Sequence, residues 1–199
     1  MKSIFKVIIE TNPMLPGWCE LDKALTLASI VLATRPETSL EIGVFGGRGF
    51  LPIALAHKAI GKGMAVGIDP WSREVAMREQ TADIDRKWWG ELDYEKLHHN
   101  FMALLQHTQT DGVSKIFRAE SKDVVCPTKL GLLHVDVSHS MTALADVKKF
   151  APQVIQGGFC VTDDTQWTGG GVLAAEQALS GMGFKFLYKP GTGAVFQRL

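Results

Sequence analysis

The sequence predicts a Rossmann-like three-layer α/β sandwich, with a mostly parallel seven-stranded sheet and an antiparallel C-terminal hairpin. Three observations predict it. Short apolar runs alternate with helical runs along the chain, a glycine-rich turn follows the first run, and the last sixteen residues form two strand-like runs around a Pro-Gly-Thr-Gly turn. A length of 199 residues fits one domain over residues 1–199, because a single core can serve up to about 250 residues.

The first element is a helix within an N-terminal helical segment, residues 1–36. Four apolar residues at spacings of four, three and four form one stripe of this helix: Leu21, Leu25, Ala28 and Leu32. Pro36 ends the helix, since the residue before a proline disfavours helical geometry.

A strand over residues 39–45 then leads into the glycine turn. The next elements are a helix over 50–60 and a buried strand over 64–68 that ends at Asp69. After residue 112 the alternation resumes with strands over 116–117, 130–137 and 157–161. The later helices span 141–151 and 172–182, before the terminal hairpin.

A polar, tryptophan-rich insertion, about residues 71–112, interrupts this alternation and is too short for a core of its own. One amphipathic helix lies within it, with an apolar face formed by Tyr94, Leu97, Phe101, Leu104 and Leu105. The adjacent Trp88 and Trp89 have two readings: a substrate wall, because sugars and flat rings pack on indole, or a satellite hydrophobic cluster.

Composition excludes several classes of protein. Lys plus Arg (21) equals Asp plus Glu (21), so the basic excess typical of nucleic-acid or membrane-surface binding is missing. We expect neither partner. Membrane-length apolar runs and a signal-peptide cleavage pattern are also missing, and the three widely spaced cysteines fit reduced thiols. We therefore expect a cytoplasmic protein with a small-molecule partner, and a homo-oligomer stays open.

Polar residues at the carboxyl ends of the strands are informative, because ligands bind there in open α/β sheets. The first strand ends LEIGVFGGRG, which lacks the G-x-G of the dinucleotide fingerprint but permits close approach of a ligand. A purely structural turn is the alternative. Asp69, in GIDPW, could accept both hydroxyls of a ribose or only cap the turn before Pro70.

The fourth and fifth predicted strands carry more acids. Asp136 follows the fourth, three residues before His139, and Asp163 and Asp164 follow the fifth. Converging carboxylates repel one another, and a hard divalent cation bound by oxygen removes the conflict. The alternative is that Asp164 caps a helix and Asp136 makes a turn. His134, inside the apolar run, is expected to be a fully hydrogen-bonded core histidine.

Together these motifs resemble the class I S-adenosylmethionine-dependent methyltransferases, in particular the small divalent-metal-dependent (macrocin-type) O-methyltransferases. The resemblance covers residues 21–199 apart from the insertion. It rests on the order and separation of EIG-x-x-x-G, IDPW, VD-x-x-H and GG-x-x-x-x-DD.

The resemblance implies roles for particular residues. The S-adenosylmethionine site would comprise Glu41, Gly43, Phe45, Gly47, Gly49, Asp69, Trp71, Ala119, Glu120, Ser121 and Asp136. Asp69 would hold the ribose, and residues 119–121 would border the adenine. A divalent cation such as Mg²⁺ would be held by Asp136, Asp163 and Asp164, with His139 as general base.

Two departures from the family pattern stand out. Gly49 replaces a usual Ser or Thr, and Val137 and Ser138 replace a Gly and an acid.

The resemblance implies metal-assisted methylation of a hydroxyl on a small molecule or sugar. The alternative is a non-catalytic protein that binds a nucleotide-like ligand on the same fold. A nicotinamide-dependent oxidoreductase is disfavoured by the missing G-x-G and the terminal hairpin.

Overall fold

A computed structural model describes residues 3–78, 82–137, 140–166 and 170–199. The seven strands form one sheet in the order β3-β2-β1-β4-β5-β7-β6. They are β1 (Thr38–Ile42), β2 (Met64–Asp69), β3 (Ser114–Arg118), β4 (Leu130–Val135), β5 (Val154–Thr162), β6 (Phe184–Tyr188) and β7 (Ala194–Arg198). β1 to β5 pair in parallel, and β7 is antiparallel to both β5 and β6, which confirms the predicted sheet and hairpin.

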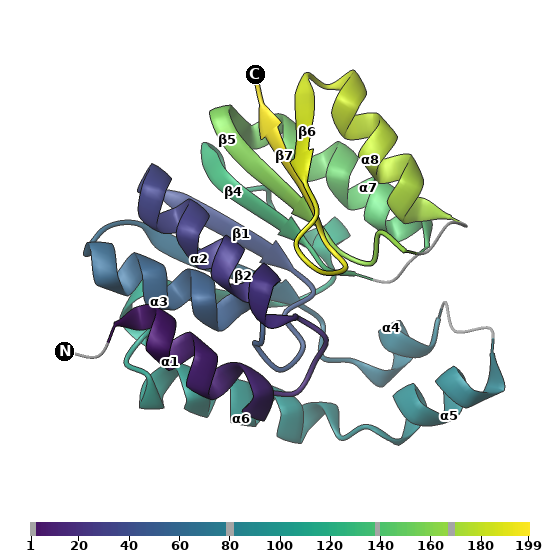
Figure 1. The fold of residues 1–199 in the computed structure, drawn as a ribbon. Helices are drawn as coiled ribbons and strands as arrows, with labels where there is room; N and C mark the ends of the chain where they lie inside the picture. The colour runs from purple at the N-terminus through teal and green to yellow at the C-terminus, as the bar shows by residue number, and fades with distance from the viewer. Residues whose placement is uncertain (1–2, 79–81, 138–139, 167–169) are drawn as a thin grey trace.

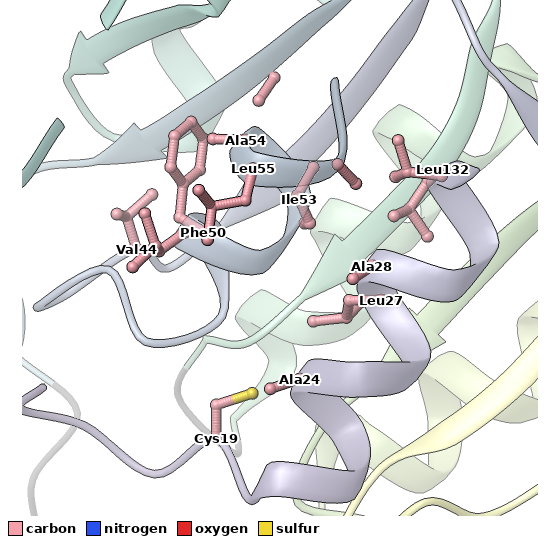
Figure 2. Packing of buried hydrophobic residues seen from close by; sticks show 14 of the residues in the cluster. Cys19, Ala24, Leu27, Ala28, Val44, Phe50, Ile53, Ala54, Leu55 and Leu132 are labelled. Carbon is pink, nitrogen blue, oxygen red and sulfur yellow. The ribbon is translucent and has the colours of Figure 1, made fainter. Parts of the chain in front are cut away.

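Helices cover both faces of the sheet (Figure 1). The helices are α1 (Ile4–Thr11), α2 (Leu21–Thr34), α3 (Phe50–Ile60), α4 (Arg73–Met77), α5 (Asp83–Glu91), α6 (Tyr94–His107), α7 (Met141–Phe150) and α8 (Gly171–Gly181). Side chains of α1, α2, α3 and α6 contribute to one buried apolar cluster, and side chains of α7 and α8 contribute to a second. Figure 2 shows part of the first cluster, where α2 and α3 pack side by side over the sheet. The predicted three layers are therefore present.

The helix predicted after residue 21 is present, but its buried face differs from the predicted stripe. The structure buries Lys23, Ala24, Leu27, Ala28, Ile30 and Val31, whereas Leu21 is 37% exposed. Of the four predicted positions, only Ala28 belongs to the buried set. The two stripes lie next to each other on the helix, so the apolar spacing alone does not choose between them.

Several strand bounds also differ from the prediction. β3 spans Ser114–Arg118 instead of 116–117, and β4 ends at Val135 instead of residue 137. β1 ends at Ile42 because Gly43 (φ +88°) turns the chain out of the strand, so residues 43–45 belong to the loop. β5 begins at Val154 instead of residue 157, with an irregularity opposite residues 130–132 of β4 and Gly157 at φ +78°. A positive φ in a strand is typical of a bulge, which the glycines allow.

The insertion forms α4, α5 and α6. Tyr94, Phe101 and Leu105 of the predicted amphipathic face are buried, so this face packs on the domain as expected. α5 has no fully buried residue. Among the described residues, no helix has the length and apolarity needed to cross a membrane.

Candidate active site

The predicted site residues that the structure describes follow the carboxyl ends of the strands, where strand order reverses between β1 and β4. Backbone hydrogen bonds continue past the strand ends and fix this edge. Gly43 N–H donates to the Ile68 carbonyl (2.9 Å), Asp136 N–H to Ile42 (2.9 Å), and Asp163 N–H to Val135 (3.1 Å). The loops that carry the predicted acids are thereby held in register with one another.

Asp69 joins the loops that follow β1 and β2. Its carboxylate accepts hydrogen bonds from Phe45 N–H (2.9 Å) and Trp71 N–H (2.7 Å), and Trp71 Nε1 donates to the Phe45 carbonyl (2.8 Å). Burial raises the pKa of Asp69, and the backbone N–H donors partly offset this rise. A carboxylate has about four acceptor positions, so lone pairs stay available for two hydroxyls.

Residues 119–121, predicted to border the adenine, begin beside Asp69, and their role at the adenine stays a prediction. Ala119 N–H donates to the backbone carbonyl of Asp69 (3.1 Å). The Glu120 carboxylate pairs with Arg78 and Lys122, each at 2.8 Å. The hydrogen bonds from these two cations lower the pKa of Glu120 to about 2. The segment is therefore next to Asp69, and its acidic side chain is engaged by neighbouring cations.

Two glycines of the turn are required by packing within the protein. A Cβ on Gly43 would lie 1.6 Å from the Asp136 carbonyl oxygen, and one on Gly47 would lie 2.6 Å from the Phe101 ring. Both residues have φ near +85°, a region that favours glycine. Packing within the protein therefore requires glycine at both positions, and contact of this turn with a cofactor stays a prediction.

Glu41 and His134 form a buried pair on adjacent strands. His134 Nδ1 lies 2.9 Å from Glu41 Oε1, and both side chains are at most 1% exposed. Desolvation lowers the pKa of His134 to about 3 and raises that of Glu41. Within the described part of the chain, Glu41 Oε2 and His134 Nε2 have no hydrogen-bond partner. His134 is therefore a core histidine as expected, but it is not the fully hydrogen-bonded one that we predicted, because only one ring nitrogen has a partner among the residues described.

Sequence reasoning missed Lys23, whose fully buried ammonium lies on the predicted metal site. Lys23 Nζ bonds Asp163 Oδ2 and lies 3.3 Å from the Trp18 carbonyl oxygen and 3.4 Å from Glu20 Oε2. Burial by itself lowers the pKa of Lys23, but the carboxylates of Asp136 and Asp163 outweigh it and raise the pKa above its ordinary value. The side chain is therefore a fixed cation. The only feature of the sequence that could have indicated a buried Lys23 is its place beside the apolar positions of α2.

The three aspartates predicted as metal ligands do not fit an oxygen-coordinated Mg²⁺. Asp163 uses both carboxylate oxygens, because Oδ1 also accepts from Asp164 N–H (2.7 Å) and Thr192 Oγ1 (2.8 Å). Lys23 lowers the pKa of Asp163 against the effect of burial, whereas desolvation and the charge of Asp163 raise the pKa of Asp136. Mg²⁺ needs near-octahedral oxygen ligands and keeps several waters. The Lys23 ammonium, which bonds Asp163, occupies the place where the Mg²⁺ ion would have to bind.

A second acid and histidine group shares Asp136. Ligand atoms of Glu41, His134 and Asp136 lie within 4.8 Å of one another. However, His134 Nδ1 is already hydrogen-bonded to Glu41, and these two side chains are almost completely buried. This environment suits a neutral buried pair better than a hydrated dication.

Four aromatic rings gather over the glycine turn. This aromatic cluster consists of Trp18, Phe45, Trp88 and Trp89, with ring centroids 4.9–6.3 Å apart. The rings come from the N-terminal segment, the turn after β1 and α5. Trp18 is 57% exposed and Trp88 43% exposed, so the cluster presents ring surface to solvent beside the site. Trp18 was a further residue that sequence reasoning missed.

The N-terminal segment is fixed across the same turn. The Arg48 guanidinium donates to the Gly17 carbonyl (2.7 Å) and to Asn12 Oδ1 (3.1 Å). A Cβ on Gly46 would lie 2.2 Å from Pro16, so this segment packs directly on the turn.

His139, the predicted general base, lies outside the described residues.

Comparisons with known proteins agree with this fold. Residues 40–165, more than half of the chain, match the model of a family described as a methyltransferase domain. No curated protein matches the sequence. Three similar solved structures are an O-methyltransferase from Bacillus cereus in complex with SAH, TomG from Streptomyces achromogenes with SAM, and CalS11, a TDP-rhamnose 3'-O-methyltransferase.

These structures share the fold at low sequence identity. The Bacillus cereus protein has a TM-score of 0.64 at 11% identity, with 100% of this chain and 92% of that chain covered. TomG has a TM-score of 0.63 at 12% identity, with 100% and 91% covered. CalS11 has a TM-score of 0.55 at 13% identity, with 97% and 92% covered. The chain therefore belongs to the methyltransferase-domain family and is a methyltransferase on the class I S-adenosylmethionine-dependent fold.

Proposed function

We propose that this methyltransferase moves a methyl group from S-adenosylmethionine to a hydroxyl oxygen of a small molecule, such as a sugar hydroxyl. The observation that carries the proposal is the position of Asp69, which has acceptor capacity for ribose hydroxyls and lies against Phe45, Trp71 and Ala119. The TDP-rhamnose 3'-O-methyltransferase CalS11, a structure with the same fold, supports the choice of oxygen as acceptor.

The chemistry divides between cofactor and protein. When bound, the cofactor supplies a methyl group on a sulfonium sulfur, which an acceptor oxygen displaces directly. Asp69 would fix the cofactor, and the aromatic cluster would hold the acceptor by packing ring surface against it. His139 would take the acceptor proton, because an imidazole with a pKa near 6.5 is mostly neutral at pH 7. The proposal includes no divalent cation, since Lys23 engages Asp163.

Two measurements test this proposal. Calorimetric titration with S-adenosylhomocysteine would establish cofactor binding. Transfer of a labelled methyl group from S-adenosylmethionine would then be measured on a panel of nucleotide sugars, free glycosides and phenols, with the matching deoxy compounds as controls. Methyl transfer to a hydroxyl compound, but not to its matching deoxy compound, would support the proposal. Cofactor binding without transfer to any member of the panel would contradict the choice of these hydroxyl acceptors. Absence of cofactor binding would favour the alternative of a non-catalytic protein that binds another nucleotide-like ligand.

A further inference from the structure

We propose that the Lys23 ammonium takes the place of a divalent cation at the carboxylates that follow β4 and β5. The protein would thus carry its own counter-charge and would not bind Mg²⁺ or Mn²⁺ there. This inference goes beyond the proposed function, because it concerns cation binding by the free protein and needs neither cofactor nor acceptor.

The first line of evidence is the set of partners around the ammonium. An ammonium has three donors and no acceptor. Lys23 Nζ has Asp163 Oδ2, the Trp18 carbonyl oxygen (3.3 Å) and Thr192 Oγ1 (3.4 Å) within hydrogen-bonding distance. Because the side chain is 0% exposed, these protein atoms replace water as its partners. The cation is therefore held by the protein alone.

The second line of evidence is that the lysine stem occupies a site built for it. α2 supplies the side chain, and the turn between β6 and β7 covers it. A Cβ on Gly193 would lie 3.1 Å from Lys23 Cδ, so a larger residue would press on the stem. The single hydroxyl proton of Thr192 can donate to Asp163 Oδ1 (2.8 Å) or to Glu20 Oε2 (3.0 Å), so the turn lies within hydrogen-bonding distance of the acid that receives the ammonium.

The third line of evidence is the state of the acid itself. Asp163 is 4% exposed, and each of its oxygens already accepts at least one hydrogen bond. A dication at this carboxylate would have to displace the ammonium or approach it at short range, where like charges repel strongly in a desolvated site. The lysine and the metal are therefore mutually exclusive at Asp163.

Mn²⁺, detected by electron paramagnetic resonance, is the probe for the test. The unaltered protein, without cofactor, should leave the free Mn²⁺ signal unchanged, and its melting temperature should be the same with Mg²⁺ or with a chelator. In Lys23→Ala the acid loses its ammonium and gains space. That variant should bind about one Mn²⁺, and Mn²⁺ at about five times its Kd should raise the melting temperature by roughly 2–4 °C.

Three controls complete the experiment. Lys6→Ala removes an exposed lysine of α1 (61% exposed) and should behave like the unaltered protein. Asp163→Asn should abolish any Mn²⁺ binding that occurs at this acid. If Lys23→Ala does not fold, Lys23→Met, which removes the charge and keeps an apolar stem, is tested for Mn²⁺ binding in the same way, and adding Asp163→Asn to it should abolish that binding.

The outcomes separate the alternatives. Binding of one Mn²⁺ by the unaltered protein, lost in Asp163→Asn, would overturn the inference. A folded Lys23→Ala protein that binds no Mn²⁺ would also overturn it, because the carboxylates would then form no cation site. Neither result depends on methyl transfer, so failure of the proposed function leaves this test intact.

Discussion

A Cβ on Gly49 would lie 2.3 Å from Glu41 Oε1 and 3.1 Å from His134 Cε1. The missing side chain at position 49 therefore leaves room for the buried Glu41–His134 pair. The resemblance to the O-methyltransferases implies a Ser or Thr at this position. In this chain the same space is taken by the carboxyl group of β1 and the imidazole of β4.

We expect Gly49→Ser to destabilise the protein. The added atoms would clash with Glu41 and disturb its bond to His134, and overpacking of a core site typically costs about 1–3 kcal/mol. Urea unfolding would measure the loss. Gly181→Ala is the matched control, since no atom lies within 4 Å of its added Cβ, and it should change stability by less than about 0.5 kcal/mol. Equal effects of the two substitutions would contradict the packing argument.

Acid should destabilise the protein partly through His134. The pKa of His134 is about 3 in the folded protein and near 6.5 when unfolded, so the unfolded chain binds a proton that the folded one does not. Stability is therefore lost as the pH falls from 6.5 toward 3, with a slope that approaches about 1.4 kcal/mol per pH unit.

Glu41 acts in the opposite direction above pH 4.5, because burial raises its pKa. Below pH 4.5 it is protonated in both states, and His134 is the member of the pair that still titrates. Urea unfolding between pH 4.5 and 3 should therefore show a shallower loss of stability in His134→Gln than in the unaltered protein. Parallel curves would show that His134 is already charged in the folded state.

Asp69→Asn should weaken binding of S-adenosylhomocysteine at least tenfold. The substitution removes the charge from hydrogen bonds to the ribose hydroxyls, and bonds to a charged group contribute roughly 1.5–3 kcal/mol. Calorimetric titration would give the Kd, and circular dichroism would check the fold, because Asp69 also bonds two backbone N–H groups. Glu74→Gln, at an exposed acid on α4, is the control. Unchanged affinity in Asp69→Asn would place the cofactor elsewhere.

His139→Ala should lower kcat by about 10²–10⁴-fold and leave the cofactor Kd unchanged, since general bases contribute within that range. The assay is methyl transfer to an acceptor found with the panel of hydroxyl compounds. Loss of activity should be greatest near neutral pH, where the imidazole is the available base. Near-normal turnover in the variant would remove His139 from the mechanism.

Trp88→Ala should raise KM for the acceptor and spare cofactor binding. Trp88 is a half-exposed member of the aromatic cluster, and loss of an aromatic contact worth about 0.5–1.5 kcal/mol corresponds to a factor of about 2–12. Leu173→Ala, at an apolar residue of α8 that is 47% exposed, is the control. An unchanged KM would show that the aromatic cluster holds α5 against the domain and does not contact the acceptor.

Much of the fold follows from local pattern. Parallel strands buried on both faces show continuous apolar runs, so β2 and β4 could be located within two residues. The acids after those strands were also predictable, because strand ends meet at one edge of such a sheet. The buried face of α2 was harder, since two neighbouring apolar stripes run along that helix.

Partners far apart in sequence could not be predicted. Lys23 bonds Asp163, which lies 140 residues further along the chain, and no periodicity links α2 to the end of β5. The geometry of the strand ends alone favoured a cation between the aspartates. We predicted a divalent metal ion there, whereas the packing of α2 beside the terminal hairpin places the Lys23 ammonium at Asp163.

The same packing has a consequence for biosynthesis. Thr192 lies within hydrogen-bonding distance of Glu20 and of the acid that receives the Lys23 ammonium. During translation, α2 leaves the ribosome well before the turn that covers Lys23, because Glu20 and Thr192 are 172 residues apart. Contacts of such long range form slowly, because the loop-closure entropy must be overcome before the contact stabilises the chain. On a translating ribosome, the acidic edge of the sheet is therefore completed only after the chain has emerged through Thr192.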